Sequence, residues 1–578
     1  MQTSAQKVQS IVQIHFHGEI PHIQYRVKCL EFLAFLESQE SISTMSFKFP
    51  TLSEIPTEYS ISQIHQRQYL IDGELRVWNG NMVSVSSPIF YSESGKNSQV
   101  QIGSYPAFGT TEALEALASC EKAYDGGSGI WPRSTIEDRI KAIQKFTNLM
   151  IKERDLIIKL LMWEIGKTLK DSAKEFDRTI EYINDTINAL KEGDRSSSRF
   201  VFEKGILAQI KRAPYGIVLC MGPFNYPLNE TFCTLIPALA MGNTVLFKPA
   251  KFGVLLLEPL LKCFQEAFPK GVINTLYGDG ATVVTPIMET GKVDVFAFIG
   301  SSTTANIIAK KHPRLNRLRS VLGLNAKNPA IILEDCDLDK AIPEILSGSL
   351  SFNGQRCTAL KIIFVPQKIA ENFLKKYLDA LSAWKAGMPW EKDVMLTPLP
   401  EDGKTKWLTE LMSDAIAKGA KIQNEGGGIV NESFMFPAVL YPISKNSRLY
   451  NEEQFGPLVP IVPYNDIDET IKYVKESNLG QQASIFGKNP KIIGMLTDIL
   501  VNQVARVNIN TQCQRGPDSF PFTGRKDSAD GTLSVTDALR VFSIRSLVAA
   551  KDDEESKQIF REILESKSSS FISTHFIL

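Results

Sequence analysis

Between residues 216 and 311, short apolar runs alternate with longer segments, and this alternation constrains the fold more than any other feature of the sequence. The apolar runs predict strands at 216–221, 243–249, 272–278 and 293–300. The segments that follow them predict helices at 227–241, 253–268, 281–291 and 302–311. Because strands alternate with helices, we expect a doubly wound α/β unit with a parallel sheet. Ligands of such sheets bind beyond the carboxyl ends of the strands.

The chain on both sides of this unit is also expected to be ordered. A helix is predicted to begin at Ser134, because Ser134 and Glu137 have the spacing of a capping box. The run 538–550 is predicted to be a strand, and a charged helical tail is predicted from Lys551. A second α/β region is indicated by apolar runs at 329–335, 361–366 and 482–487.

Charge and composition exclude several classes of partner. Lys and Arg number 64, as do Asp and Glu, so the net charge is zero and neither nucleic acid nor an anionic membrane is an expected partner. No apolar run is long enough to cross a bilayer. The eight cysteines include no CxxC pair, so we expect no disulfide framework and no metal site. This cysteine pattern is typical of a reducing compartment, and a cytoplasmic location is predicted.

Five separated segments carry the strongest functional signal. They are GPFNYPLN (222–229), FKPAKFG (247–253), FIGSST (298–303), FNGQRCTA (352–359) and EEQFGPLVP (452–460). In this order they resemble the aldehyde dehydrogenase superfamily, from about residue 65 to 550. The resemblance implies an α/β fold with a variant Rossmann cofactor domain, an α/β catalytic domain and a small β oligomerisation element. It also implies a homodimer or a homotetramer.

The resemblance divides the chain into five parts. A loosely ordered N-terminal extension is expected at 1–44. The NAD(P)-binding domain follows, with part of an oligomerisation hairpin near 196–213. The other parts are the catalytic domain, a return to the cofactor domain with an oligomerisation strand, and a C-terminal tail. The NAD(P)-binding domain is predicted at 45–330 and the catalytic domain at 331–510. The return with the oligomerisation strand is predicted at 511–550, and the C-terminal tail at 551–578.

Cys357 is the predicted nucleophile. A lone cysteine is usually an inert core residue, but the resemblance implies that this thiolate attacks an aldehyde. The adjacent Arg356 is expected to lower its pKa. The resemblance also implies an oxyanion site made of the Asn225 side-chain amide and the Cys357 backbone N–H, each donor worth roughly 3 kcal/mol. The alternative for Asn225 is a role in the turn before Pro227.

The cofactor is predicted to be NADP, with NAD as a further possibility. Neither a GxGxxG pattern nor a P-loop occurs, so a nucleotide requires another arrangement. By resemblance, Lys248 binds the cofactor ribose and Lys251 favours a 2′-phosphate, since NAD-preferring relatives often carry glutamate there. The alternative for Lys251 is a solvated surface lysine. The remaining implied cofactor residues are Gly300 and Ser301 at the pyrophosphate and Glu453 and Phe455 at the nicotinamide ribose and ring.

The substrate is predicted to be a small phosphorylated aldehyde. GQRCTAL and QRGPDSFPFTGRKDS (514–528) resemble the non-phosphorylating glyceraldehyde-3-phosphate dehydrogenases. Guanidinium groups suit phosphate because their planar donors bind it in bidentate fashion. The resemblance implies irreversible, NADP-dependent oxidation of glyceraldehyde 3-phosphate to 3-phosphoglycerate, through a thiohemiacetal and a thioester. The implied phosphate-binding residues are Arg178, Tyr226, Arg356 and Arg515. For Arg178, an ion pair on a helix surface is the alternative.

One position departs from the family pattern. The segment GLNAK (323–327) aligns with the family's ELGGK, and Gly323 stands where the glutamate that activates water is expected. Such a general base is worth roughly 100- to 10,000-fold in rate. Glu453 could replace it, or the glycine could admit another acyl acceptor such as coenzyme A or phosphate. A shifted alignment with Glu334 as the base, and a non-enzymatic member of the fold, remain further alternatives.

Overall fold

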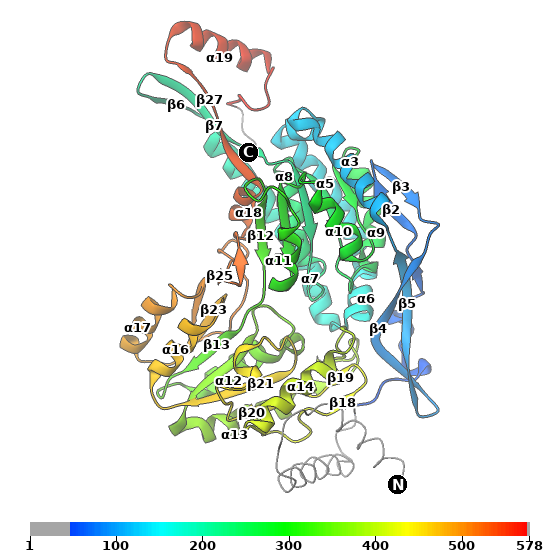
Figure 1. Cartoon of the computed structure of the whole chain (residues 1–578), viewed down its shortest axis with the longest axis vertical. Coiled ribbons are helices and arrows are strands. Elements are labelled where there is room, and N and C mark those ends of the chain that lie inside the picture. Colours follow the sequence, from blue (N-terminus) through cyan, green and yellow to red (C-terminus); the bar gives the residue numbers. More distant parts are fainter. Residues whose placement is uncertain (1–46, 575–578) are drawn as a thin grey trace. The chain divides into compact units, whose positions relative to one another are not determined.

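The computed structural model describes residues 47–574, so the predicted extension at 1–44 lies outside the described residues. The described residues from Lys48 onward belong to one compact unit. This unit contains two large sheets, two sheets of three strands, and several two-stranded ones; of the three-stranded sheets, one is antiparallel throughout (Figure 1). The predicted α/β class is confirmed. The predicted boundaries at 330 and 510 stay predictions.

The first large sheet has six strands in the order β10-β9-β8-β11-β12-β26, all parallel except β26. The four strands predicted between 216 and 300 are confirmed. The strands β12 and β26 were not predicted. The bounds are β8 (Ile217–Met221), β9 (Thr244–Lys248), β10 (Ile273–Thr275), β11 (Val295–Ile299), β12 (Arg319–Gly323) and β26 (Ala529–Asp530).

The register of this sheet aligns the carboxyl ends of its central strands. Met221 is paired with Lys248 on one side and with Phe298 on the other, and Ile299 is paired with Gly323. After β8 the chain adds β9 and β10 on one side and then crosses to the other side for β11. A ligand crevice is expected where the strand order reverses in this way. The crevice lies between the ends of β8 and β11.

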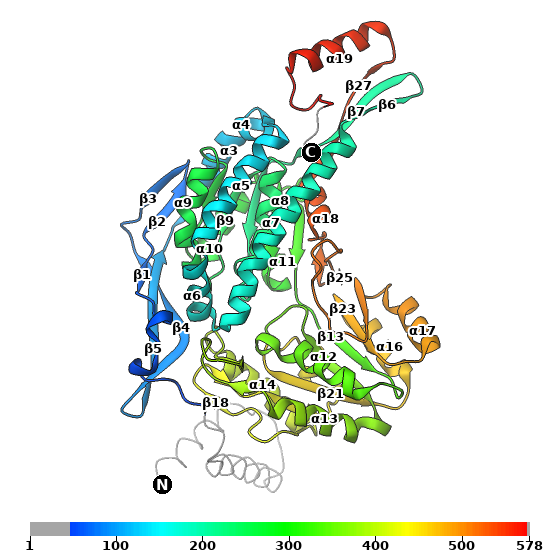
Figure 2. The same ribbon diagram turned by 180° about the vertical axis from the view of Figure 1, so that it is seen from behind.

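Helices cover the first sheet, and their boundaries follow from their caps. Helix α3 packs on β8, β9 and β10, whereas α8 packs on β8, β9 and β11 and is itself covered by α5 and α7 (Figure 2). The predicted capping box is wrong by one residue. Thr135 is the N-cap of α5 and accepts from the Asp138 N–H at 3.1 Å, while the Ser134 hydroxyl donates to the Trp131 carbonyl. The bounds are α3 (Thr110–Tyr124), α5 (Ile136–Lys152), α7 (Leu169–Ser197) and α8 (Asn229–Ala240).

The second large sheet has seven strands in the order β17-β20-β21-β14-β13-β23-β24. Along β14, Ile362 and Phe364 join one hydrophobic cluster, and Ile363 and Val365 join the other. Both faces are therefore buried, which explains why its central strands read as continuous apolar runs. The bounds are β13 (Asn328–Ile332), β14 (Leu360–Pro366), β17 (Lys421–Ile422), β20 (Ala438–Tyr441), β21 (Leu458–Tyr464), β23 (Gln482–Phe486) and β24 (Arg506–Ile509).

Helices on the two faces of the second sheet complete this part of the fold. One cluster includes α12 and α13, and the other includes α14, α16 and α17. The loop before α14 reaches the cavity that contains Cys357. The bounds are α12 (Leu338–Leu350), α13 (Ala370–Ser382), α14 (Lys404–Ala417), α16 (Ile467–Glu476) and α17 (Pro490–Leu500).

The small sheet is antiparallel, in the order β27-β7-β6, and it extends away from the first large sheet (Figure 1). The predicted strand at 538–550 is partly wrong, because its first residues complete a helix, α18. The predicted helical tail is confirmed as α19, whose Phe560 ring packs edge-on against Phe200 at 5.2 Å. The bounds are β6 (Phe200–Glu203), β7 (Ile206–Pro214), α18 (Val535–Val541), β27 (Ser543–Lys551) and α19 (Glu554–Ser566).

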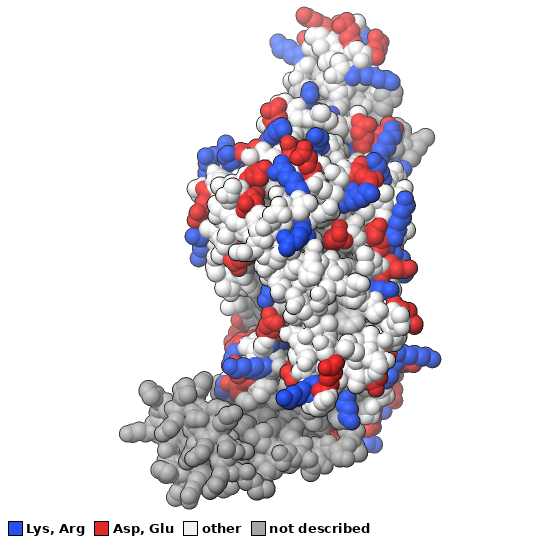
Figure 3. Space-filling view, turned by 90° about the vertical axis from the view of Figure 1, so that its right-hand side faces the viewer, with Lys and Arg blue, Asp and Glu red and all other residues white. Residues whose placement is uncertain are grey.

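Positive and negative side chains are interspersed on the face drawn in Figure 3, as a net charge of zero would suggest. Among residues 47–574, no helix has the length and apolar character needed to cross a membrane.

Candidate active site

A cavity of about 590 Å³ lies beyond the carboxyl ends of the first sheet and brings the predicted catalytic and cofactor residues together. The loop after β8 and the turn after β11 form part of its wall, and the nucleophile and the loop before α14 approach from the second sheet. The four predicted substrate residues are not part of this lining. The predicted residues that line it are Asn225, Lys248, Lys251, Gly300, Ser301, Cys357, Glu453 and Phe455.

A strained turn positions Cys357. It lies between a short 3-10 helix, η5 (Ser351–Gly354), and the start of β14. Phe352 and Asn353 adopt left-handed backbone conformations, with φ of 50° and 55°, which are uncommon for residues other than glycine. The Asn353 side chain fixes this geometry through two hydrogen bonds to Thr397, at 3.0 and 3.1 Å. Strain of this kind concentrates at functional sites.

The environment of the Cys357 thiol differs from the predicted one. Burial raises the pKa of the thiol, and among the nearby cations Lys361 lowers it more than Arg356 does. The prediction that Arg356 lowers the pKa of Cys357 is confirmed in direction, but this effect is smaller than that of Lys361, and burial keeps the net pKa raised. The Lys361 ammonium donates to the Cys357 carbonyl at 3.0 Å and pairs with Glu453 at 2.5 Å.

Arg356 is half-buried, and its hydrogen bonds tie it to the C-terminal end of α12. Its Nη2 donates to the Ser347 carbonyl at 3.1 Å and to the Gly348 carbonyl at 2.8 Å. Its Nε is buried and has no hydrogen-bond partner. An unsatisfied buried donor costs about 1–3 kcal/mol, so this atom offers a place for an incoming acceptor.

Asn225 is buried in the loop after β8, and its Nδ2 donates to the Gln355 carbonyl at 2.8 Å. This contact joins the predicted oxyanion donor to the loop that carries Cys357. The neighbouring Gly222 allows the loop to approach α8, because a Cβ at this position would lie 1.6 Å from the Thr231 hydroxyl.

A fully buried ion pair between Lys167 and Glu175 holds the same loop. Glu175 accepts from the backbone N–H groups of Leu228 and Asn229, at 3.0 and 3.1 Å. The Lys167 ammonium donates to the Asn225 carbonyl at 2.7 Å. It also lies 3.7 Å from the centroid of the Tyr226 ring. Sequence reasoning missed this pair, although its two members are only eight residues apart at the start of α7.

The cofactor side of the cavity has features suited to a dinucleotide. Ser301 is the N-cap of α11 (Ser302–Lys310) and accepts from the Thr304 N–H at 3.1 Å. A Cβ on Gly300 would lie 2.4 Å from the Phe298 ring, so only glycine leaves this turn open. Burial lowers the pKa of the Lys248 amine to about 8. Lys251 is largely exposed and pairs with the equally exposed Asp402 at 2.9 Å.

Gly323 leaves the position of the expected glutamate without a side chain, and Glu453 is the predicted alternative base. A Cβ at this position would make only ordinary contacts with Ile299, at 3.4 Å and beyond. Both oxygens of Glu453 are bonded, one to Lys361 and the other to the Asn325 amide at 2.6 Å. Asn325 also accepts from the Ser302 N–H at 2.8 Å and so connects Glu453 to the start of α11.

Lys361 and Asn325 were not predicted, although one of them left a signal. A lysine inside an apolar strand that is buried on both faces must be paired, and Lys361 is such a residue. Asn325 occupies a position in the aligned GLNAK segment, but its partner lies 128 residues away. The alternative base Glu334 pairs with Lys368 at the surface and is not part of the cavity lining.

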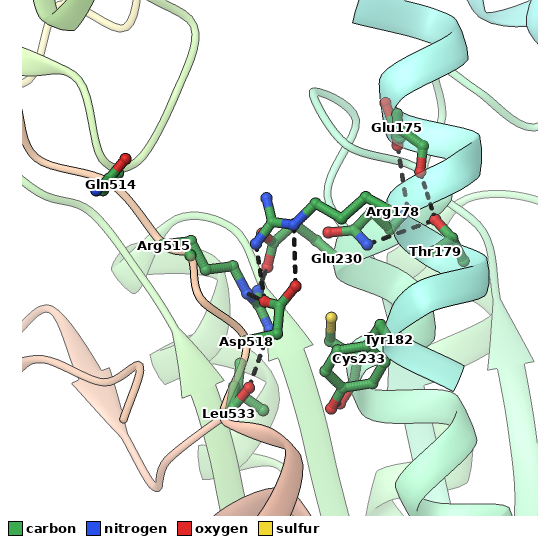
Figure 4. Close-up of polar contacts among 12 residues, drawn as sticks. Glu175, Arg178, Thr179, Tyr182, Glu230, Cys233, Gln514, Arg515, Asp518 and Leu533 are labelled. Carbon is green, nitrogen blue, oxygen red and sulfur yellow. Dashed lines mark hydrogen bonds and ion pairs between the residues drawn. The ribbon is translucent and has the colours of Figure 1, made fainter. Parts of the chain in front are cut away.

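The predicted arginines Arg178 and Arg515 meet at one carboxylate (Figure 4). Asp518 accepts from the Nε and Nη2 of Arg178 at 2.9 and 2.8 Å, and from the Nε of Arg515 at 3.1 Å. Arg515 also pairs with Glu230, which lines the cavity. Burial raises the pKa of Tyr226, and the nearby charges of Arg356 and Arg178 oppose this increase, so the three residues lie near one another at one end of the site.

The sequence and the fold are similar to those of known proteins. The chain is 33% identical over 465 residues to the NADP-dependent glyceraldehyde-3-phosphate dehydrogenase of Streptococcus equinus, covering 78% of this chain and 92% of that protein. It is 29% identical over 484 residues to the protein of the same name from Triticum aestivum, covering 82% and 93%. A crystal structure of such an enzyme from Bacillus halodurans, complexed with NADP, is 30% identical with a TM-score of 0.77, covering 86% and 100%. The sequence model of the aldehyde dehydrogenase family matches residues 92–547, so the chain belongs to this family.

Proposed function

We propose that this protein oxidises glyceraldehyde 3-phosphate to 3-phosphoglycerate with NADP, through a covalent intermediate on Cys357. The observation that carries the proposal is the single cavity shared by Cys357, Asn225 and all six predicted cofactor residues. The relatives from Streptococcus equinus and Triticum aestivum are NADP-dependent glyceraldehyde-3-phosphate dehydrogenases, which supports this substrate and cofactor. Assembly as a homodimer or homotetramer is part of the same proposal.

The residues present fit NADP. Gly300 leaves the turn before α11 open, and the N-terminus of a helix favours an anionic group. Lys248 and Lys251 provide cations on the same wall. The Lys251–Asp402 pair is exposed, and exposed pairs are worth about 0–1 kcal/mol, so Lys251 is free to turn toward a 2′-phosphate. When bound, NADP would supply the hydride acceptor.

The protein's own groups then handle the aldehyde. The Cys357 thiolate forms a bond to the aldehyde carbon, and the Asn225 amide together with the Cys357 N–H stabilises the resulting oxyanion. The Asn225 Nδ2 has a second N–H for this purpose, beside the one that it donates to the Gln355 carbonyl. Loss of a hydride from that carbon leaves a thioester at Sγ. Water cleaves the carbon–sulfur bond, which releases the carboxylic acid and returns a proton to the thiol.

An acylating reaction, with coenzyme A or phosphate as the acceptor, is the second candidate. Two observations favour it. Gly323 has no side chain to activate water, and both carboxylate oxygens of Glu453 are bonded to Lys361 and Asn325. In the hydrolytic reaction, Glu453 must exchange one of these contacts for water. In the acylating reaction, the space beside Gly323 admits the acceptor instead.

A comparison of two aldehydes tests the proposed substrate. The kcat/KM of NADP reduction should be higher for glyceraldehyde 3-phosphate than for unphosphorylated glyceraldehyde. A charged hydrogen bond is worth about 1.5–3 kcal/mol, so we expect a ratio of roughly 10 to 100 or more. Arg356→Leu should reduce this ratio, because it removes the unpaired Nε donor. Equal kcat/KM values for the two aldehydes would contradict the proposal, and product formation only with coenzyme A or phosphate would favour the acylating reaction.

A further inference from the structure

Glu230 is an acidic residue in an unexpected place. It lies in the first turn of α8, a helix in which every residue is buried, and its side chain is only 8% exposed. It is also one of the residues that line the cavity containing Cys357. A carboxylate in the wall of a cavity proposed to bind a phosphorylated aldehyde requires an explanation, because the two groups repel each other.

The partner of Glu230 is Arg515, one of the predicted phosphate-binding residues (Figure 4). All three nitrogens of this guanidinium are bonded: Nη1 to Glu230, Nε to Asp518, and Nη2 to the Leu533 carbonyl at 3.0 Å. Arg178 is likewise held by Asp518 in bidentate fashion. Two carboxylates therefore balance two guanidinium groups, and this cluster has no net charge.

The two carboxylates have different places in the cluster. Asp518 bridges both arginines and is only three residues from Arg515, so it belongs to the loop that positions Arg515. Glu230 approaches from α8, on the cavity side, and contacts Arg515 at one nitrogen. Of the two carboxylates, Glu230 is the one that an incoming anion can displace.

We infer that Glu230 and the distal anionic group of the substrate compete for Arg515, so that Glu230 determines how strongly the site prefers a phosphorylated aldehyde. This inference rests on the proposed function. Arg356 is the only one of the three predicted arginines with a buried, unpartnered nitrogen in the described residues. It supplies the first contact to the phosphate, and Arg515 adds a second contact only when Glu230 releases it.

The test compares three proteins: the wild type, Glu230→Gln and Glu230→Asp. The probe is inorganic phosphate, measured as a competitive inhibitor of NADP-dependent oxidation of unphosphorylated glyceraldehyde. We expect Glu230→Gln to lower the Ki of phosphate roughly tenfold, and to lower KM for glyceraldehyde 3-phosphate more than it changes kcat. Glu230→Asp keeps the charge but shortens the side chain, so its Ki should lie between the other two. If Glu230→Gln fails to fold, the Ki of phosphate for Glu230→Asp tests the inference by itself.

Glu401→Gln is the matched control. Glu401 lines the same cavity but pairs with Lys404 at 3.0 Å, so its neutralisation removes the same charge without releasing Arg515. Its Ki for phosphate should change much less than that of Glu230→Gln. An unchanged or higher Ki in both Glu230 variants would overturn the inference.

The competition for Arg515 and the proposed function can fail independently of each other. If the wild type does not prefer glyceraldehyde 3-phosphate but Glu230→Gln still binds phosphate more tightly, then the competition holds and the substrate assignment fails. If the wild type prefers the phosphorylated substrate and the Glu230 variants bind phosphate no better, the competition is refuted and the proposed function stands.

Discussion

The reactivity of Cys357 should reflect its environment at the level of a single residue. Burial raises the pKa of this thiol above its ordinary value near 8.5, so the reactive thiolate becomes populated only at higher pH. We expect the rate of inactivation by iodoacetamide to rise with pH through the region above 8.5. Lys361→Met should move the profile to still higher pH, because the Lys361 cation favours the thiolate.

Cys336 provides a control for this experiment, because it is the other cysteine of the described residues that is not fully buried. Cys336→Ser should still lose activity on alkylation, whereas Cys357→Ser should have no activity to lose. A profile with a midpoint below 8.5, or alkylation of Cys357 without loss of activity, would contradict this description of the nucleophile.

Cofactor preference is a second property that depends on one residue. Lys251→Glu should lower the ratio of kcat/KM for NADP to that for NAD by roughly 10- to 100-fold, because it replaces a charged hydrogen bond by charge repulsion. Steady-state kinetics with both cofactors measure this ratio. Asp402→Asn removes only the partner of Lys251, and it should keep or increase the preference for NADP. A ratio unaffected by Lys251→Glu would mean that this lysine is only a solvated surface residue.

How far single residues could be predicted depends on the distance of their partners along the chain. The residues within motifs, such as Cys357 and Asn225, were named from sequence, and the cavity contains both. The carboxylates that neutralise the arginines were not named, because Glu230 and Arg515 are 285 residues apart. Asn325 and Lys361 were missed for the same reason, because both bind the carboxylate of Glu453, which lies on a distant segment.

At the level of elements, the Lys167–Glu175 pair should be essential to the loop after β8. Lys167→Met leaves Glu175 buried without its cation, and breaking a buried pair costs about 3–5 kcal/mol. We expect a markedly lower Tm by scanning calorimetry and a lower kcat, since the Asn225 carbonyl loses a donor. Lys170→Met, at an exposed position of α7, the helix that carries Glu175, should change neither.

The double variant Lys167→Met with Glu175→Leu separates the two effects. It removes both charges, so much of the lost stability should return. The kcat should stay low, because Asn225 and the N–H groups of Leu228 and Asn229 still lack their partners. Full recovery of kcat in the double variant would contradict the positioning role of this pair.

The sequence predicted strongly periodic elements well and short or edge elements poorly. The strand β12 escaped prediction because only part of it is buried, so its sequence lacks a continuous apolar run. In the run 538–550, the residues that complete α18 and those that form β27 are equally apolar, and only the tertiary packing separates them. The start of α5 was misplaced by one residue because Ser134 and Thr135 are both suitable N-caps, and Ser134 is engaged by Trp131.

For the whole molecule, the edge strand β27 is the expected surface for association between copies. Ile544 and Leu547 on this strand are 47% and 60% exposed, and Phe202 on the opposite edge strand is 60% exposed. Uncovered edges with apolar side chains favour pairing with another chain. Leu547→Glu should therefore shift the mass measured by light scattering toward the monomer. Leu315→Glu, at an equally exposed apolar residue elsewhere, should not. An unchanged mass for Leu547→Glu would place the interface on another surface.

The time course of NADPH formation from glyceraldehyde 3-phosphate and NADP, without coenzyme A or phosphate, distinguishes hydrolysis of the thioester from transfer to another acceptor. The hydrolytic reaction proposed above predicts continued turnover, with 3-phosphoglycerate as the product and Glu453 giving up one of its contacts to activate water. A single burst of about one NADPH per subunit, followed by no further reaction, would show a thioester on Cys357 that water does not cleave. That result would contradict hydrolysis and establish a need for another acyl acceptor.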